Sequence, residues 1–290
     1  MGIPVCLGVI GGSGVYQMEG AEFVKHHDLM TPFGLPSAPI VEAKVADRTL
    51  FFIPRHGLGH RFLPSEVPYR ANIFALKMLG VTHVLAVSAV GIMQDSIKPG
   101  DMVIPDQIFD RTNGQRAASF FGNGVVGHVG FADPFCEEMR TVAIDATMSC
   151  GARLYKGGTY VAMEGPLFST RAESHFYRNT LSPSVIGMTA IPEAKLAREA
   201  ELSYGLLATA TDYDCWHATE EDVSVEAVLK VLKENGQMVQ KIVKKVAEIL
   251  PKTSGAPSLS AARFAIMTSK ETIPAKIKDD LRPLYGKYWD

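Results

Sequence analysis

The chain has 290 residues, of which 47% are hydrophobic and 21% are charged, a balance that excludes wholesale disorder. Lys and Arg number 29 against 31 Asp and Glu, so the formal net charge of −2 argues against a polybasic binder of nucleic acid or membranes but allows a local cationic pocket. The four cysteines form no C-x-x-C pair, which disfavours zinc and thioredoxin-type sites and indicates free thiols in the cytoplasm. The most apolar early run, Val5–Ile10, is too short for a signal peptide or a membrane span, so we expect no membrane association.

Strand-like and helix-like patterns alternate along the chain. Apolar runs predict strands at residues 5–10, 40–45, 50–53, 83–88, 102–104, 159–163, 185–187 and 203–210. Helical periodicity predicts helices at 65–79, 137–149, 192–201 and 224–250, and the spacing of Thr170 and Glu173 predicts a capped helix start. This order predicts an α/β fold over residues 1–250, a single domain with a central mixed β-sheet flanked by helices on both faces. A stretch with Pro and Gly at 251–257 ends that domain and leaves residues 251–290 as a C-terminal extension of unknown role.

A glycine-rich loop, Gly11-Gly12-Ser13-Gly14, follows the first predicted strand, where α/β proteins often bind ligands. It is not a dinucleotide fingerprint, because Gln17 stands where the third glycine belongs, and no Gly-Lys-Ser/Thr follows to make a triphosphate-binding loop. A nucleophile elbow centred on Ser13 fails at Val15. Two interpretations remain open: backbone N–H groups and the Ser13 hydroxyl facing an anion, or a tight turn.

Arg55 and His56 follow another predicted strand. The guanidinium fork suits a phosphate and His56 would add a further donor, whereas the alternative is an arginine in a surface salt bridge. His56 and His60 are four residues apart, like paired metal ligands on a helix, but Gly57 and Gly59 disfavour a helix there. We therefore expect an anion site and no metal site.

Two acids, in Asp212-Tyr213-Asp214, end the last near-continuous apolar strand. On an extended chain their side chains would point the same way and repel, so that one can stay protonated near neutral pH. Such a pair can give a proton to a heterocycle nitrogen or accept a hydrogen bond from an amine, whereas the alternative is a turn with two solvated acids. Glu164 also ends a strand, either as a ligand acid or as a partner of Arg171.

Taken in chain order, these segments resemble the trimeric branch of the purine nucleoside phosphorylase family. Each is weak alone, but the ordered set over residues 7–250 is specific, and its last member points to the branch that acts on aminopurines. The matching segments are Gly11-Gly12-Ser13-Gly14, Thr31-Pro32-Phe33-Gly34, Arg55-His56-Gly57 with His60, Pro64-Ser65 through Tyr69-Arg70-Ala71-Asn72, Ser88-Ala89-Val90-Gly91, Pro99-Gly100-Asp101, Glu164-Gly165-Pro166 with Phe168 and Ser169, Arg171-Ala172-Glu173-Ser174, Met188-Thr189 with Pro192-Glu193, and Ala210-Thr211-Asp212-Tyr213-Asp214-Cys215-Trp216.

The resemblance implies a pentosyltransferase whose catalytic domain covers residues 1–250. The implied reaction is phosphorolysis of 5′-methylthioadenosine to adenine and 5-methylthioribose 1-phosphate, with inorganic phosphate as co-substrate and with no cofactor or metal. The resemblance implies a phosphate site at Ser13, Arg55, His56, Ser88, Ala89 and Thr189, with Ala89 acting through its backbone N–H.

The resemblance also implies how the nucleoside is held. Met188 would lie against the ribose, Phe168 would stack on the base, and Asp212 and Asp214 would read adenine at N7 and at the 6-amino group. Catalysis is thereby assigned to Asp212, Asp214 and His56. The 5′-methylthio group would contact Val225, Val228 and Leu229 of this chain. His128 of a neighbouring subunit would contact it as well. Periodicity alone places the three helix residues in the core. A homotrimer with shared active sites is therefore implied.

Three positions depart from the family pattern. Ser13 and Ser88 stand where Thr is common and keep a hydroxyl, whereas Gly187 stands where Asn is usual and weakens a polar contact. The alternative functions are a phosphorylase for adenosine or 6-oxopurine nucleosides, a hydrolytic nucleosidase that needs no phosphate site, and a non-catalytic nucleotide-binding module.

Overall fold

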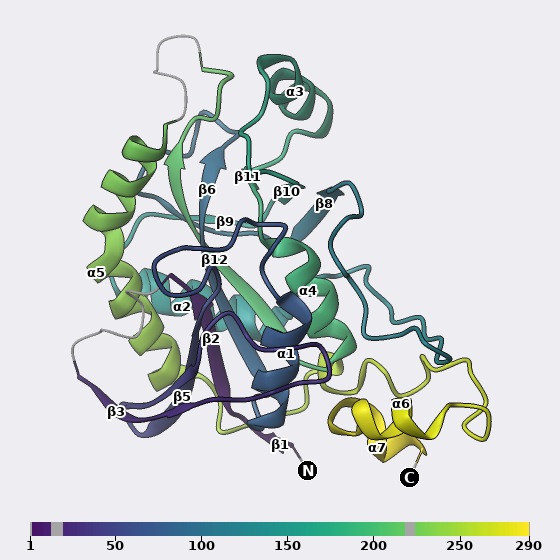
Figure 1. The fold of residues 1–290 in the computed structure, drawn as a ribbon. Helices are drawn as coiled ribbons and strands as arrows, with labels where there is room; N and C mark the ends of the chain where they lie inside the picture. The colour runs from purple at the N-terminus through teal and green to yellow at the C-terminus, as the bar shows by residue number, and fades with distance from the viewer. Residues whose placement is uncertain (1, 13–19, 218–223, 290) are drawn as a thin grey trace.

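The computed structural model describes residues 2–12, 20–217 and 224–289 (Figure 1). Within these residues, eleven strands form one branched mixed sheet. Its main path runs through β3 (Ala21–His27), β4 (Ile40–Val45), β5 (Arg48–Pro54), β2 (Leu7–Gly11), β6 (His83–Ile92), β11 (Val185–Gly187), β10 (Thr159–Met163) and β8 (Gln107–Arg111). A branch adds β12 (Ser203–Asp212), β7 (Met102–Ile104) and β9 (Leu154–Lys156).

Strand β6 joins the two parts of the sheet. It pairs in parallel with β12 over most of its length and with β2 as far as Ala86, whereas Gly91 and Ile92 pair antiparallel with β11. Residues 83–87 of β6 and 203–211 of β12 are all buried, which explains their continuous apolar sequences, because both faces of these strands are covered. Beyond Ala86 the edge of β6 that faced β2 is open to side chains from other elements.

Helices cover both faces of the sheet, which confirms the predicted fold class (Figure 1). On one face α2 (Glu137–Ser149) packs against α5 (Val225–Ile249), and their apolar residues share a core cluster with those of β2 and β5. On the other face α1 (Tyr69–Met78) packs against α4 (Ala190–Glu199) in a second cluster. In the described part of the chain, no helix is both long and apolar enough to cross a membrane.

Capping side chains and proline determine where two of the helices begin. The predicted capping box is confirmed before α3 (Arg171–Phe176), where Thr170 Oγ1 accepts from the Glu173 N–H at 3.2 Å and the Glu173 carboxylate accepts from the Thr170 N–H at 2.8 Å. A π-helical turn, Tyr177–Leu181, continues this helix. The helix expected from residue 65 begins only at Tyr69, because Pro68 keeps the preceding residue out of the helical region.

The segment after residue 250 packs against the rest of the chain. Its short strand β13 (Thr253–Ser254) pairs with β1 (Ile3–Pro4), and a 3₁₀ turn (Pro257–Ser260), α6 (Ala275–Asp280) and α7 (Arg282–Trp289) follow. Helix α7 contacts α1, and the buried Glu201 carboxylate accepts from the Ala262 N–H at 3.0 Å and from the Tyr288 hydroxyl at 2.5 Å. The weak periodicity of this segment did not predict its helices. The domain division at residue 250 remains a prediction.

Candidate active site

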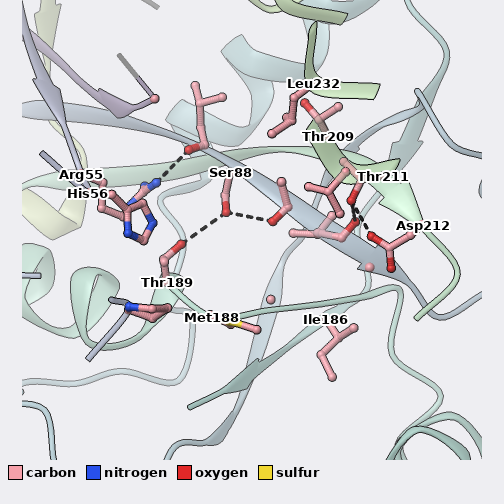
Figure 2. A pocket seen from close by; sticks show the side chains of 18 of the residues that line it. Arg55, His56, Ser88, Ile186, Met188, Thr189, Thr209, Thr211, Asp212 and Leu232 are labelled. Atoms are coloured by element: carbon pink, nitrogen blue, oxygen red, sulfur yellow. Dashed lines mark hydrogen bonds between the residues drawn. The ribbon is translucent and has the colours of Figure 1, made fainter. Parts of the chain in front are cut away.

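A cavity of about 560 Å³ opens where β6 meets β11 and β12 (Figure 2). Strand direction reverses between β6 and β11 at this point, so the ends of several strands converge on one space. Figure 2 shows Arg55 and His56 at one side of the cavity and Thr211 and Asp212 at the other, with Ser88 and Thr189 between them.

Arg55 follows β5 and is fixed by a buried ion pair. Its Nε donates to Glu193 Oε2 at 2.7 Å, its Nη2 to Glu193 Oε1 at 2.9 Å and its Nη1 to the Val87 carbonyl at 2.9 Å. Glu193 also accepts from the Tyr204 hydroxyl at 2.9 Å. The surface salt bridge considered as the alternative is therefore wrong: the pair is buried, and it orients the guanidinium at the cavity wall.

His56 presents a neutral imidazole. Its Nδ1 lies 2.9 Å from the Phe62 carbonyl, which can only accept, so Nδ1 carries the proton. Burial, together with the charge of Arg55 and the neighbouring His60, lowers the pKa of His56 to about 4. The further donor expected at this position is therefore an acceptor, Nε2, in the free protein. His56 and His60 stack at 4.2 Å, and among the described residues no set of three potential metal ligands gathers here or elsewhere.

Hydroxyl and backbone groups complete this side of the cavity. Ser88 Oγ donates to the Ala89 carbonyl at 3.1 Å and lies 3.3 Å from Thr189 Oγ1, and all three residues line the cavity. The packing of Tyr160 accounts for the glycine at position 187, because a Cβ there would come within 2.1 Å of the Tyr160 hydroxyl oxygen. That hydroxyl accepts from the Thr189 N–H at 3.4 Å. Ser13 lies outside the described residues.

Asp212 and Asp214 both line the opposite side of the cavity. The strand ends at Asp212, and Asp214 lies in a turn with a left-handed backbone, φ 51°. A turn, and not the extended chain that we expected, therefore brings both side chains to the cavity. Asp212 accepts from the Thr211 hydroxyl at 2.6 Å and from the Asp214 N–H at 2.9 Å. Burial raises the pKa of both acids, which favours a proton on this side of the cavity.

Arg116 is a residue that sequence reasoning missed. Its Nη1 donates to the carbonyls of Met188 and of Ile191, the latter at 2.7 Å, and its Nε donates to Glu164 Oε1 at 2.8 Å. Glu164 is therefore paired with Arg116 and not with Arg171, as considered above. Arg116 lies in a loop far from any recognisable motif, so its sequence context gave no signal.

The apolar part of the cavity includes Phe168, Met188, Val228 and Leu232. Gly165 has a positive φ of 68°, and any Cβ there would come within 2.5 Å of Met188 Sδ, so glycine is needed for this contact. The expected contacts at the other helix residues differ: Val225 and Leu229 are 64% and 59% exposed and do not line the cavity. Both side chains lie near the start of α5, before Leu232, and are exposed to solvent in this chain.

His128 is exposed and does not line the cavity of its own chain. Its N–H donates to the Ala265 carbonyl at 2.9 Å, and the neighbouring Met267 N–H donates to the Val126 carbonyl at 2.8 Å. The C-terminal segment thus holds the loop that carries His128. Around it the apolar side chains of Phe264, Met267 and Val126 are 87%, 70% and 50% exposed.

Comparison with known proteins places this site in a family. The model of the phosphorylase superfamily matches residues 7–248. The chain is 52% identical over 282 residues to S-methyl-5'-thioadenosine phosphorylase of Geobacter sulfurreducens, covering 97% of this chain and 98% of that protein. The chain belongs to the phosphorylase superfamily.

Solved structures of phosphorylases also resemble this chain. A methylthioadenosine phosphorylase from an antarctic soil metagenomic library superposes with a TM-score of 0.90 at 44% identity, over 97% of this chain and 99% of that one. A mutant of the adenosine/methylthioadenosine phosphorylase of Schistosoma mansoni, in complex with methylthioadenosine, matches with a TM-score of 0.79 at 38% identity, over 84% of this chain and 91% of that one. Because the first match extends over nearly the whole of both chains, much of the segment after residue 250 is shared with that protein.

Proposed function

We propose that this chain is a pentosyltransferase that cleaves 5′-methylthioadenosine with inorganic phosphate to adenine and 5-methylthioribose 1-phosphate. The observation that carries the proposal is the polarity of one cavity: donors for an anion stand at one side and carboxyl groups with raised pKa values stand at the other. A nucleoside lying between them would have its anomeric carbon next to the anion and its purine next to the acids. The similarity to phosphorylases named for this substrate supports the same assignment.

The phosphate is bound by Arg55, Ser88, Ala89, Thr189 and Ser13. Arg55 retains one Nη1 N–H beyond those used for Glu193 and Val87. Backbone groups two residues apart on an extended strand point to the same edge, so the Ala89 N–H lies on the edge where the Val87 carbonyl accepts from Arg55. These groups hold a phosphate oxygen in line with C1′, which removes most of the entropy that the attack would otherwise require.

The purine leaves as its bond to C1′ breaks. The sugar becomes positively charged, which the adjacent phosphate stabilises, while the bonding electrons move into the base. Asp212 in its protonated form delivers a proton to N7, and Asp214 accepts from the 6-amino group. Phosphate is the co-substrate, and no further cofactor is required, because a positioned anion and an acid are sufficient for this displacement.

The 5′-methylthio group lies against Met188, Val228 and Leu232. His128 of a neighbouring copy closes this end in a homotrimer with shared sites. Two observations support this: α5 forms part of the cavity wall, and the exposed apolar residues around His128 offer a contact surface. The four cysteines are unpaired, which fits the reducing cytoplasm.

The test is release of adenine from methylthioadenosine with and without phosphate. We expect release that depends on phosphate, together with formation of the sugar 1-phosphate. Release without phosphate would make the protein a nucleosidase, and binding without any release would make it a binding module.

A second candidate is a phosphorylase for adenosine or 6-oxopurine nucleosides. Gly187 with Tyr160 favours it, because this pair alters the polar contacts beside Met188. The ratio of kcat/KM for methylthioadenosine to that for adenosine tests the 5′ substituent, whereas the ratio to that for inosine tests the base, since the acids at 212 and 214 should disfavour the 6-oxo base by roughly 5- to 150-fold. The two ratios together decide between the candidates.

A further inference from the structure

The proton on His56 is on the side that faces away from the cavity contents. Nδ1 donates to Phe62, and Nε2 has no hydrogen-bond partner among the described residues although the ring lines the cavity. A neutral imidazole with Nδ1 protonated can only accept at Nε2. The ring is stacked on His60, lies beside Arg55, and is largely buried, and all three conditions disfavour a second proton.

The cations around His56 are already balanced. Arg55 forms a two-point pair with Glu193, and Arg116 pairs with Glu164 at 2.8 Å. Both arginines are buried. Among the described residues, the charged and titratable groups that face the His56 ring are these two ion pairs and His60. Because each arginine is paired with a glutamate, they add little net positive charge beside the ring. The described part of the site therefore recognises an anion by individual hydrogen bonds more than by excess charge.

We propose that His56 Nε2 accepts a hydrogen bond from a P–OH group, so that the site selects tetrahedral anions that carry a proton and disfavours those that do not. This rests on the proposed function, because it specifies the form in which the co-substrate binds. Hydrogen phosphate has such a proton. Sulfate has the same shape and the same double negative charge, and it has no proton to offer at neutral or alkaline pH.

The physical reason is an unpaired acceptor. With sulfate, Nε2 would face an oxygen lone pair, and neither atom would have a donor. Leaving a buried acceptor unpaired next to an anion weakens binding by about tenfold or more. The selection acts against the wrong anion and adds little attraction for the right one.

The experiment compares anions at constant ionic strength and about pH 8, where phosphate is mainly the dianion. The inhibition constants of sulfate and monofluorophosphate, another dianion with no P–OH, are compared with the KM of phosphate. Thermal stabilisation by each anion gives a binding readout that does not need turnover. We expect sulfate and monofluorophosphate to bind at least about tenfold more weakly than phosphate. Binding of either dianion within about threefold of phosphate would overturn the proposal.

The variant His56→Gln tests whether the anion preference comes from the acceptor at Nε2 or from the shape of the site. The glutamine amide reaches the position of Nε2 and can turn either its oxygen or its NH₂ group towards the anion. The preference for phosphate should therefore fall to about threefold or less, with sulfate gaining affinity. His26→Gln, a change of the same kind on the exposed face of β3, is the control and should keep the wild-type ratio. An unchanged ratio in His56→Gln would also overturn the proposal, and if that variant does not fold, the wild-type comparison still decides.

The two proposals fail in different ways. If phosphate supports no turnover but stabilises the protein selectively, the proposed function fails and the anion selectivity holds. If phosphate supports turnover and sulfate competes equally well, the function holds and the role of His56 fails.

Discussion

Arg55 and Glu193 form a buried two-point ion pair that ties the end of β5 to α4, with Nε–Oε2 and Nη2–Oε1 distances of 2.7 and 2.9 Å. This pair uses two of the five N–H donors of Arg55, and the carbonyls of Val87 and Ile10 accept two more, which leaves one Nη1 N–H for the cavity. Because both side chains are buried, neither has water to replace a lost partner. The proposed anion site therefore depends on this buried ion pair for the position of its arginine.

Replacing Glu193 by Gln should damage both folding and phosphate binding. An unpaired buried arginine destabilises a protein by about 3–5 kcal/mol, and its orientation is no longer fixed. Urea unfolding measures the stability, and the KM of phosphate should rise more than that of the nucleoside. Tyr204→Phe removes only the hydroxyl contact with Glu193 and should lose about 1 kcal/mol. Equal phosphate KM values in wild type and Glu193→Gln would contradict this account.

The activity should fall with rising pH through the ionisation of Asp212. Burial is the main reason that the pKa of Asp212 is raised, and the charge of Asp214 adds to it. Since the proposed proton donor is the protonated acid, kcat/KM should decrease as pH rises through this raised pKa. Asp212→Asn should have lower activity and lose that dependence, because its amide does not titrate. A variant that retains the same alkaline limb would assign the titration to another group.

Arg116→Lys should impair nucleoside binding more than phosphate binding. A lysine cannot reach the carbonyls of Met188 and Ile191 and the carboxylate of Glu164 together, so the backbone around the sugar loses its support. We expect kcat/KM for the nucleoside to fall by about 10-fold or more, with the phosphate KM within about twofold. Arg153→Lys, the same change at an exposed arginine, is the matched control. A selective rise in the phosphate KM would be the opposite of this expectation.

Gly187→Ala should be destabilising because of Tyr160. The new Cβ would lie 2.1 Å from the tyrosine hydroxyl oxygen, and such overpacking destabilises by about 1–3 kcal/mol. The double variant Gly187→Ala with Tyr160→Phe should recover part of the loss, since it removes the atom that clashes. Thermal or urea unfolding of the four proteins gives the coupling energy. Additive effects would show that the two residues do not interact in this way.

The proposed trimer can be tested by complementation. His128→Ala and Asp212→Asn should each be weakly active, but subunits mixed under exchange conditions should regain activity, since a mixed interface joins an intact Asp212 to an intact His128. Phe264→Glu should shift the assembly towards monomers in sedimentation velocity, because a charge would enter an apolar contact. Activity in the mixture equal to the mean of the two variants would place His128 outside the partner's site.

The sequence best predicts those strands whose residues are buried along most of their length. Strands β6 and β12 are buried on both faces, so their apolar runs give their positions directly. Strand β3 is largely exposed and β8 lies at an edge, so neither has a regular apolar pattern. Helices α6 and α7 are short and rely on tertiary contacts that local periodicity does not encode.

The candidate site residues at the ends of strands could be predicted from the sequence, whereas those supplied by long loops could not. Arg55, His56, Met188, Thr189 and Asp212 all follow or end strands, so their convergence follows from the sheet. Arg116 and the pairing of Glu164 depend on a long loop whose path no local pattern specifies. The protonation of His56 likewise depends on the Phe62 carbonyl, which only the folded turn brings to Nδ1.

The pairing of β1 with β13 and the packing of α7 against α1 have a consequence for synthesis of the chain. The stack of Phe121 on Tyr285, at 5.0 Å, and the contact of Tyr285 with Trp289 can form only after Tyr285 and Trp289 have left the ribosome. The loop that carries His128 is among the elements held by that last segment. Nascent chains should therefore acquire the sheet early and the loop late, so a stalled or prematurely terminated product would hold a nearly complete cavity without the surface that the proposed trimer would use.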